Sequence, residues 1–399
     1  MRLLSSSQMI KAAALVGCAL TLGLSAGCTH QPDQVIQQRL DGDSLTLAWT
    51  YDTGGSINQP PLRVNDVLIA IGAGRPLVAL NVGTGTLRWQ YDPPDGVWER
   101  AYASDGRLVF VGVGGGRLVA LDAQTGQTRW AHDLGINVQL PPLIEGDVVY
   151  VPTTFVGPAL ENDPQRRAQL FALAISHGQA LWSFETGNYI LQTPFRYGDD
   201  LYVAGVYHDP ANDIEEGGHT RLYALSAVDG AVRWSYESED GFPKSLYATE
   251  ASVAFVGYQD FINGVDAATG KLRWRRDASN WVPALSGVGH VIYYGAATTV
   301  VYAVNANDGQ LVWQYNIPEG TFNYVLGAPI RVQDDLYFLT QHGDIVALNA
   351  LDGTLRWKLA TGIRSRVQMT VSGGWLFIGD EDGMVYAYTS HPKSVSRNP

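Results

Sequence analysis

The stretch Leu118–Trp130, LVALDAQTGQTRW, contains the pattern that decides the fold. Its four apolar residues predict a strand, the segment ending at Gly126 predicts a hairpin turn, and the residues around Trp130 predict the next strand. Six other tryptophans also follow a turn glycine by four residues: Trp89, Trp182, Trp234, Trp274, Trp313 and Trp357. Seven copies of one unit indicate a repeat architecture.

The spacing of the tryptophans predicts the size of each unit. From Trp49, which has no such turn before it, to Trp357, successive tryptophans are 40, 41, 52, 52, 40, 39 and 44 residues apart. This period fits four short strands with their turns, as in one propeller blade. We read the repeated tryptophans as wedges between blades rather than as a platform for a cofactor.

The last repeat is one strand short, and this predicts how the ring closes. Its three predicted strands are 367–371, 375–379 and 384–388, and the segment Leu45–Tyr51 supplies the missing outer strand. We therefore predict an all-β chain. Its fold is an eight-bladed β-propeller of four-stranded antiparallel blades, closed by the N-terminal strand joining the last blade.

Composition supports this class. Of 399 residues, 46% are hydrophobic and 17% are charged, which excludes a disordered chain, and the 44 glycines are typical of many turns. The chain has 27 basic and 39 acidic residues. Such an acidic body is not expected to bind nucleic acid through its overall charge.

The N-terminus reads as a lipoprotein signal. Arg2 and Lys11 precede the apolar stretch Ala12–Leu24, and Leu24–Cys28 resembles a bacterial lipobox in which the cysteine is acylated. Both cysteines of the chain, Cys18 and Cys28, lie here, so no disulfide is expected in the mature body. The alternatives are an ordinary cleavage site with a stray cysteine, or a cytosolic chain with an apolar N-terminus.

The expected domain organisation follows from the signal and the repeats. It is a signal peptide over 1–27, a lipidated tether over 28–43 beginning at Cys28, a propeller over 44–390 and a C-terminal tail over 391–399.

The turn and tryptophan pattern over residues 45–389 resembles the repeats of pyrroloquinoline-quinone-type propellers. Together with the lipobox, it is most similar to the BamB family of outer-membrane lipoproteins. The resemblance implies a non-enzymatic scaffold without a cofactor. Such a scaffold assists the assembly and insertion of β-barrel proteins by docking the BamA-like barrel-forming subunit, with unfolded barrel chains as second candidate partners. It also implies a palmitate-bearing anchor at Cys28 on the periplasmic face of a Gram-negative outer membrane, and Thr29 resembles the residue after the cysteine in lipoproteins sorted there.

Two alternatives stay open. One is a propeller lipoprotein with a different protein partner, because the loops of the middle blades do not match the family's partner-contacting segments residue by residue. The other is a quinoprotein dehydrogenase, which typically has an adjacent cysteine pair and a Ca²⁺ held by carboxylate and amide oxygens. The mature chain lacks such a cysteine pair, and the repeat positions bring no clear Glu, Asn and Asp set together.

The two 52-residue spacings contain insertions, Phe155–Ala168 and Tyr207–Thr220, that should project from one face of adjacent blades. The second insertion contains a metal-site candidate: His208, Asp209, Asp213, Glu215, Glu216 and His219. An interaction loop or an inert solvated loop is the competing interpretation.

Connections leading into the inner strands should open on the same face, which we call the mouth. The candidate partner-binding residues there are Trp98, Arg100, Lys244, Trp281, Tyr324, Arg364 and Arg366, with Glu99, Gln139 and Gln192 beside them. Four bases favour a carboxylate-bearing partner, and the aromatics would be its anchors. The competing interpretation is a hydrated channel rim. Asp380–Gly383 is predicted to be a hairpin turn rather than a Ca²⁺ loop.

Overall fold

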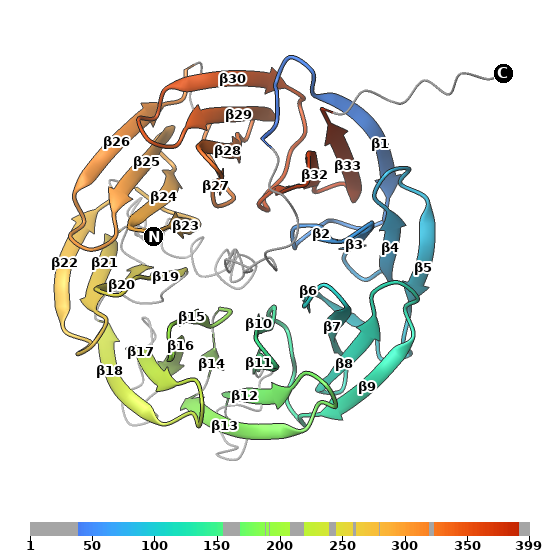
Figure 1. Cartoon of the computed structure of the whole chain (residues 1–399), viewed down its shortest axis with the longest axis vertical. Helices are drawn as coiled ribbons and strands as arrows, with labels where there is room; N and C mark the ends of the chain where they lie inside the picture. The colour runs from blue at the N-terminus through green and yellow to red at the C-terminus, as the bar shows by residue number, and fades with distance from the viewer. Residues whose placement is uncertain are drawn as a thin grey trace, which may run out of the picture.

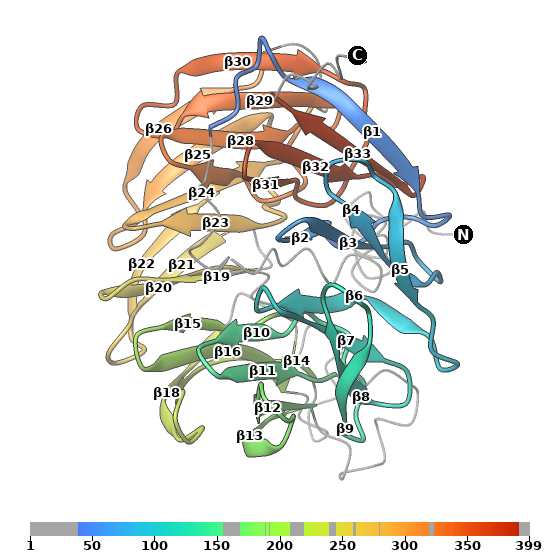
Figure 2. The ribbon, with the colours of Figure 1, turned by 45° about the vertical axis from the view of Figure 1, so that its right-hand side comes forward.

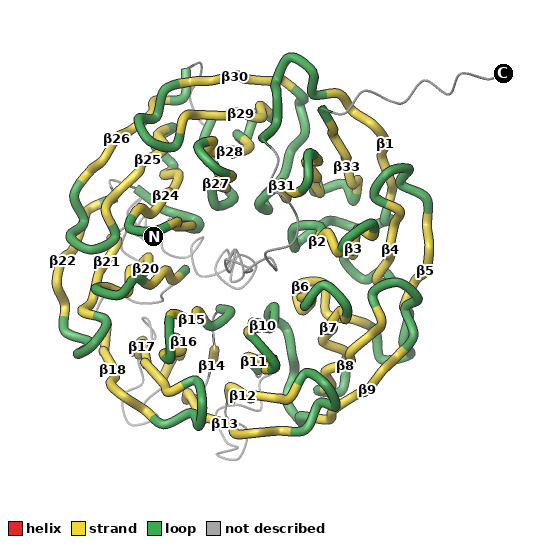
Figure 3. The backbone as a smooth tube through the Cα atoms, viewed as in Figure 1, coloured by secondary structure: helices red, strands yellow, loops and turns green. Residues whose placement is uncertain are grey.

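Eight antiparallel sheets surround a central axis in the computed structural model (Figure 1). The structure describes residues 39–154, 168–187, 189–190, 192–207, 219–238, 245–257, 261–278, 280–318 and 323–390. This part contains strands and loops without helix, as Figure 3 shows, so none of its elements is an apolar helix of membrane-spanning length. The predicted all-β, eight-bladed propeller is confirmed.

In the first four blades the strands run from the axis outward in chain order. Blade 1 consists of β2 (Leu62–Val64), β3 (Val67–Ile71), β4 (Leu77–Asn81) and β5 (Leu87–Tyr91). Blade 2 consists of β6 (Val97–Ser104), β7 (Leu108–Val113), β8 (Arg117–Asp122) and β9 (Thr128–Asp133). Blade 3 consists of β10 (Leu143–Glu145), β11 (Val148–Pro152), β12 (Ala168–Ala174) and β13 (Ala180–Gly187). Blade 4 consists of β14 (Tyr189–Ile190), β15 (Phe195–Tyr197), β16 (Asp200–Tyr207), β17 (His219–Ser226) and β18 (Val232–Ser238).

The same order continues to the end of the chain. Blade 5 consists of β19 (Leu246–Ala248), β20 (Ser252–Val256), β21 (Phe261–Asp266) and β22 (Leu272–Asp277). Blade 6 consists of β23 (Leu285–Val288), β24 (Val291–Ala296), β25 (Val300–Asn305) and β26 (Leu311–Asn316). Blade 7 consists of β27 (Ile330–Val332), β28 (Asp335–Leu339), β29 (Asp344–Asn349) and β30 (Leu355–Ala360). Blade 8 consists of β31 (Thr370–Ser372), β32 (Trp375–Gly379), β33 (Met384–Thr389) and, outermost, β1 (Thr46–Asp52).

Blade 4 departs from the four-strand pattern because its inner strand is broken. Both β14 and β15 pair with β16, the first near Gly205 and the second near Leu201. Thr193, between the two strands, donates its hydroxyl to the carbonyl oxygen of Pro141 at 2.8 Å. This bond ties the break to the connection that enters blade 3.

The apolar core is divided among the seams between blades. Within the described residues there are eight hydrophobic clusters, and each joins two neighbouring blades. For example, Val67 of blade 1 and Val109 of blade 2, both fully buried, belong to one cluster. A single blade therefore cannot bury its two faces, and the ring is needed to cover both.

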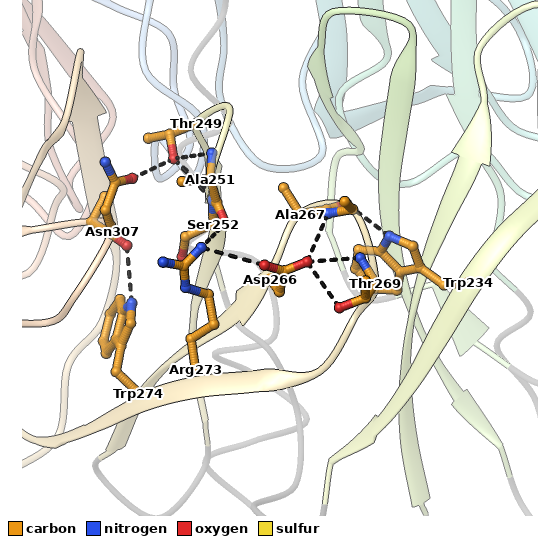
Figure 4. Close-up of polar contacts among 12 residues, drawn as sticks. Trp234, Thr249, Ala251, Ser252, Asp266, Ala267, Thr269, Arg273, Trp274 and Asn307 are labelled. Atoms are coloured by element: carbon orange, nitrogen blue, oxygen red, sulfur yellow. Dashed lines mark hydrogen bonds and ion pairs between the residues drawn. The ribbon is translucent and has the colours of Figure 1, made fainter.

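At seven of the eight seams a tryptophan of one blade is hydrogen-bonded to the next blade, as Figure 4 shows for Trp234. Its Nε1 donates to the carbonyl oxygen of Ala267 in the turn of the next blade at 2.8 Å. Six other tryptophans make the same bond at 2.7–3.3 Å: Trp49, Trp89, Trp130, Trp182, Trp274 and Trp313. The tryptophans are thus the wedges that the repeat predicts.

The turn receiving Trp234 explains the repeated glycine. The N–H of Gly270 donates to the carbonyl oxygen of Asp266 at 2.8 Å, and the Asp266 carboxylate accepts from the N–H and hydroxyl of Thr269 at 2.9 and 2.8 Å. Gly270 has φ +70°, in the left-handed region that favours glycine. A Cβ there would lie 2.5 Å from Cε3 of Trp234, so the indole requires glycine as well.

The ring closes through the two ends of the propeller, as predicted. β1 pairs antiparallel with β33, from Thr46 opposite Thr389 to Asp52 opposite Met384. Figures 1 and 2 both show the blue β1 along the dark red β33.

A segment just before β1 adds a second closure. We call Arg39–Leu45 the strap; Leu40 and Leu45 are 1% and 6% exposed and belong to the core cluster between blades 7 and 8. Gly42 lies against the ring of Trp357, where a Cβ would collide. At the other seams a turn glycine of the next blade packs against the tryptophan. At the seam between blades 7 and 8 the strap packs against Trp357 instead.

The strap is also held by polar contacts. The N–H of Leu40 donates to the hydroxyl of Tyr337 at 3.1 Å, and that hydroxyl donates to Asp335 at 2.8 Å. The fully buried Asp335 forms ion pairs with Arg39 at 2.6 Å and with Arg356 at 2.7 Å. Residues 39–43, within the segment expected to be a tether, thus pack against blades 7 and 8.

Candidate functional site

Four of the seven candidate partner-binding residues line one cavity. A hollow of about 750 Å³, here called the mouth hollow, is lined by Trp281, Tyr324, Leu326, Gln341, His342, Gly362, Arg364, Ser365, Arg366 and Glu381. It includes the predicted Trp281, Tyr324, Arg364 and Arg366. Its size is that of a binding cleft for a small ligand or a short peptide segment.

The topology explains why these residues meet. Trp281, Tyr324 and Arg364 lie in the connections that enter the inner strands of blades 6, 7 and 8. His342 and Glu381 lie in turns between the second and third strands of blades 7 and 8. In an antiparallel blade both kinds of loop lie at the same end of the strands. The hollow therefore opens on the mouth.

Backbone hydrogen bonds hold the aromatic side of the hollow. The N–H of Gln341 donates to the carbonyl oxygen of Tyr324 at 2.8 Å, and that of Ala297 donates to Trp281 at 3.0 Å. The buried Asn323 accepts from the N–H of His342 at 3.1 Å. Both aromatic residues are thus on connections fixed to a neighbouring turn.

The charged side of the hollow contains one ion pair and one exposed arginine. Arg366 Nε lies 2.5 Å from Glu381 Oε1, and their side chains are 63% and 43% exposed. Arg364 is exposed, and its side chain makes no ion pair or hydrogen bond within the described part of the chain. The N–H of Glu381 donates to the carbonyl oxygen of Arg364 at 3.3 Å, which fixes the two loops together.

The side chain of Asp380 stabilises the turn that presents Glu381. Asp380 accepts from the N–H groups of Asp382 and Met384 at 3.0 and 2.8 Å and from the hydroxyl of Tyr386 at 2.9 Å. Burial, and then the bond to Asp380, raises the pKa of Tyr386 to about 12, so this hydroxyl stays protonated and donates. The prediction of a hairpin turn at 380–383 is confirmed by this geometry, because the Asp380 carboxylate is engaged by the turn itself.

Trp98 and Arg100 lie elsewhere, on β6 of blade 2. The pairing of β6 with β7 jumps from Val97 opposite Val113 to Tyr102 opposite Val111, so β6 bulges out of the ladder between these pairs. Burial lowers the pKa of Arg100, although the neighbouring Glu99 carboxylate opposes the shift. The mouth hollow does not include them.

Other predicted positions lie outside the described residues. These are Cys28, Lys244, Phe155–Arg167 and the metal-site candidates His208 to Glu216; of the candidate His219, only the backbone in β17 is described. Within the described residues, no group of three or more His, Cys, Asp or Glu side chains is arranged to hold a metal ion. Gln192 is 1% exposed and so does not project from the rim.

The sequence interpretation missed part of the hollow: Leu326, Gln341, His342, Gly362, Ser365 and Glu381. It considered mainly the connections into the inner strands. The turns between second and third strands project at the same end, and that topological rule would have pointed to Gln341, His342 and Glu381.

Fold, repeat and seam contacts define an eight-bladed propeller with tryptophan-fastened repeats of the pyrroloquinoline-quinone type. A family model described as "Outer membrane protein assembly factor BamB" matches residues 94–205 and 166–398. The chain belongs to this family.

Two curated relatives carry the same description. The protein of Yersinia pestis is 31% identical over 153 residues, which cover 34% of this chain and 38% of the relative. That of Moranella endobia is 30% identical over 234 residues, which cover 54% of this chain and 58% of the relative. The chain thus matches less than two thirds of the length of either relative.

Solved structures support the fold. BamB from Moraxella catarrhalis has a TM-score of 0.62 at 20% identity, covering 89% of this chain and 99% of that one. Quinohemoprotein alcohol dehydrogenase from Comamonas testosteroni has a TM-score of 0.68 at 14% identity, covering 97% and 86%. At these identities the likeness concerns the fold alone.

Proposed function

We propose that this protein is a non-enzymatic scaffold in outer-membrane protein assembly, which docks the barrel-forming subunit on the periplasmic side. Membership of the BamB family is the observation that carries this proposal. The curated relatives are described as outer membrane protein assembly factors, which supports the same role here.

The mouth hollow is the proposed docking site. It combines the aromatic side chains of Trp281 and Tyr324 with the exposed guanidinium of Arg364. Aromatic and arginine side chains are the residue types that most often dominate the binding energy of a protein interface. Extended partner segments gain both anchors and hydrogen bonds in such a cleft.

The proposed location is the periplasmic face of a Gram-negative outer membrane, with acyl chains on Cys28 as anchor. Several acyl chains bind a bilayer stably, since each buried methylene contributes about 0.8 kcal/mol. Cys28→Ser is therefore expected to move the protein from washed outer membranes to the soluble periplasmic fraction. Retention of the variant in the washed membranes would contradict the anchor.

Photo-crosslinking in the native envelope tests the docking role. A photoreactive residue replaces Tyr324 in the hollow, and the control replaces Arg107, which lies in the exposed turn between β6 and β7 at the opposite end of the strands. The proposal expects the barrel-forming subunit in the Tyr324 product and its absence from the Arg107 product. No crosslink to that subunit from Tyr324 would contradict the proposed site.

The non-enzymatic part has its own test. Adding pyrroloquinoline quinone and Ca²⁺ to the purified chain, followed by gel filtration, is expected to leave no quinone absorbance with the protein. A co-eluting chromophore with stoichiometric occupancy would favour the dehydrogenase alternative.

A further inference from the structure

The charged side of the mouth hollow has an arrangement that the scaffold role alone does not explain. Two arginines, Arg364 and Arg366, come from one connection between blades 7 and 8, yet only Arg366 faces a carboxylate within the described residues. That carboxylate, Glu381, comes from the next turn of blade 8. The hollow thus contains one engaged and one available guanidinium.

The Arg366–Glu381 pair is easily exchanged. Both side chains are largely exposed, so water screens the pair and it stabilises the fold little. A carboxylate from outside can take the place of Glu381 on Arg366 at small cost. An arginine accepts a carboxylate in the same forked geometry whichever chain supplies it.

The remaining lining fixes the kind of segment that fits. Trp281, Tyr324 and Leu326 add apolar lining to the hollow of about 750 Å³ that the arginines also line. The protein as a whole has a net charge of −12. The overall charge therefore repels an acidic segment, whereas the two arginines of the hollow attract it.

We propose that the mouth hollow binds an extended acidic segment of the barrel-forming subunit, in which a carboxylate binds Arg364 and a neighbouring aromatic side chain lies against Trp281 and Tyr324. Glu381 acts as an internal competitor that occupies Arg366 until a second carboxylate displaces it. This inference rests on the proposed scaffold function and names the chemistry of the segment that the same site accepts.

The first experiment measures binding of a labelled peptide to the full chain by fluorescence anisotropy at low salt. The probe is Ser-Tyr-Asp-Phe-Asp-Tyr-Ser-Gly, and the comparison peptide has Asn in place of both Asp residues. The intact chain is expected to bind the acidic peptide at least about fivefold more tightly, with a difference that shrinks at high salt. Equal binding of the two peptides would overturn the proposal.

Variants separate the contribution of Arg364 from that of the internal competitor Glu381. Arg364→Glu is expected to weaken acidic-peptide binding by about tenfold or more, while Arg107→Glu on the opposite face leaves it unchanged. Glu381→Gln is expected to tighten binding by about two- to fivefold. Its matched control is Asp382→Asn, which removes the same charge from the adjacent exposed residue.

Weaker binding by Glu381→Gln would overturn the role of Glu381. An equal gain in affinity for Asp382→Asn would also overturn it, because the effect would then come from the overall charge of the protein. Melting curves of each variant establish that the fold is retained, and Arg364→Gln replaces the reversal if Arg364→Glu does not fold.

Competition identifies the occupant. The acidic peptide is expected to displace the purified periplasmic domains of the barrel-forming subunit from the intact chain. If those domains bind and the bound peptide does not displace them, the inference about the segment is wrong while the scaffold function stands. If the domains do not bind the intact chain at all, the scaffold function itself fails.

Discussion

At the scale of the residue, each turn glycine is required for two reasons: its positive φ and the space that the neighbouring indole takes. The sequence pattern shows only that a glycine is present. The seven turn glycines have φ between +70° and +74°, and a Cβ on each would collide with the tryptophan of the preceding blade. The first constraint was predictable from the turn. The second follows only from the ring, because the tryptophan that touches each glycine comes from a different repeat.

Gly270→Ala tests the second constraint. It is expected to lower the free energy of unfolding by about 2–4 kcal/mol, because it adds backbone strain and a clash with Trp234. Gly289→Ala is the matched control: φ is +61°, but nothing lies within 4 Å of its Cβ, so a loss of about 1 kcal/mol is expected from strain alone. Denaturant unfolding of both variants gives the difference. Equal losses would show that the indole is not a constraint.

Turn carboxylates should make stability depend on pH. Hydrogen bonding from Arg129, at 2.7 Å, and from Thr125 lowers the pKa of Asp122 to about 2. A carboxyl whose pKa is lower in the folded state stabilises the fold above its unfolded pKa of about 3.9, and this contribution is lost as the pH falls towards 2. Asp122→Asn should thus be less stable than the intact protein at pH 7, and the gap should close between about pH 4 and pH 2. An undiminished gap at pH 2 would contradict this assignment.

At the scale of the element, the packing of the strap could not be predicted from the sequence. Its residues 39–43 carry no repeat signature and follow a polar segment, so the sequence assigns them to the tether. The contacts that order it, from Arg39 to Asp335 and from Leu40 to Tyr337, join positions almost 300 residues apart. No local periodicity encodes such a pairing, whereas the strand β1 was predictable because blade 8 lacked one strand.

A truncation series separates the strap from β1. A chain beginning at Thr46 loses the burial of Leu40 and Leu45 and is expected to be less stable by roughly 2–4 kcal/mol than one beginning at Arg39. A chain beginning at Ile57 also loses β1, exposes the edge of β33 and is expected to aggregate. Melting temperatures and light scattering compare the three. If all three melt alike, the proposed closure is wrong.

The site could be predicted in part, because the repeat fixes which loops lie at the mouth. Loop position in the repeat placed Trp281, Tyr324, Arg364 and Arg366 at the mouth, and the mouth hollow contains all four. The repeat did not reveal that Arg100 is half-buried on a bulged strand or that Glu381 pairs with Arg366. Bulges and exposed side-chain pairs depend on local packing, which differs from blade to blade.

At the scale of the whole molecule, the ring is a support that presents the proposed docking site at one mouth. Eight separate seams share the burial of apolar residues, so surface substitutions in the loops leave the cores untouched. Docking and folding should therefore be separable by mutation. Such a ring can also change partner contacts by loop substitution while the fold is kept.

The central claim is that this chain captures the barrel-forming subunit through the mouth hollow. The measurement is the dissociation constant for the purified periplasmic domains of that subunit, determined for the intact chain, for Arg364→Glu combined with Tyr324→Ala, and for Arg107→Glu. The account predicts binding by the intact chain and by Arg107→Glu, and at least about tenfold weaker binding by the hollow variant at an unchanged melting temperature. Equal dissociation constants for all three folded proteins would contradict it.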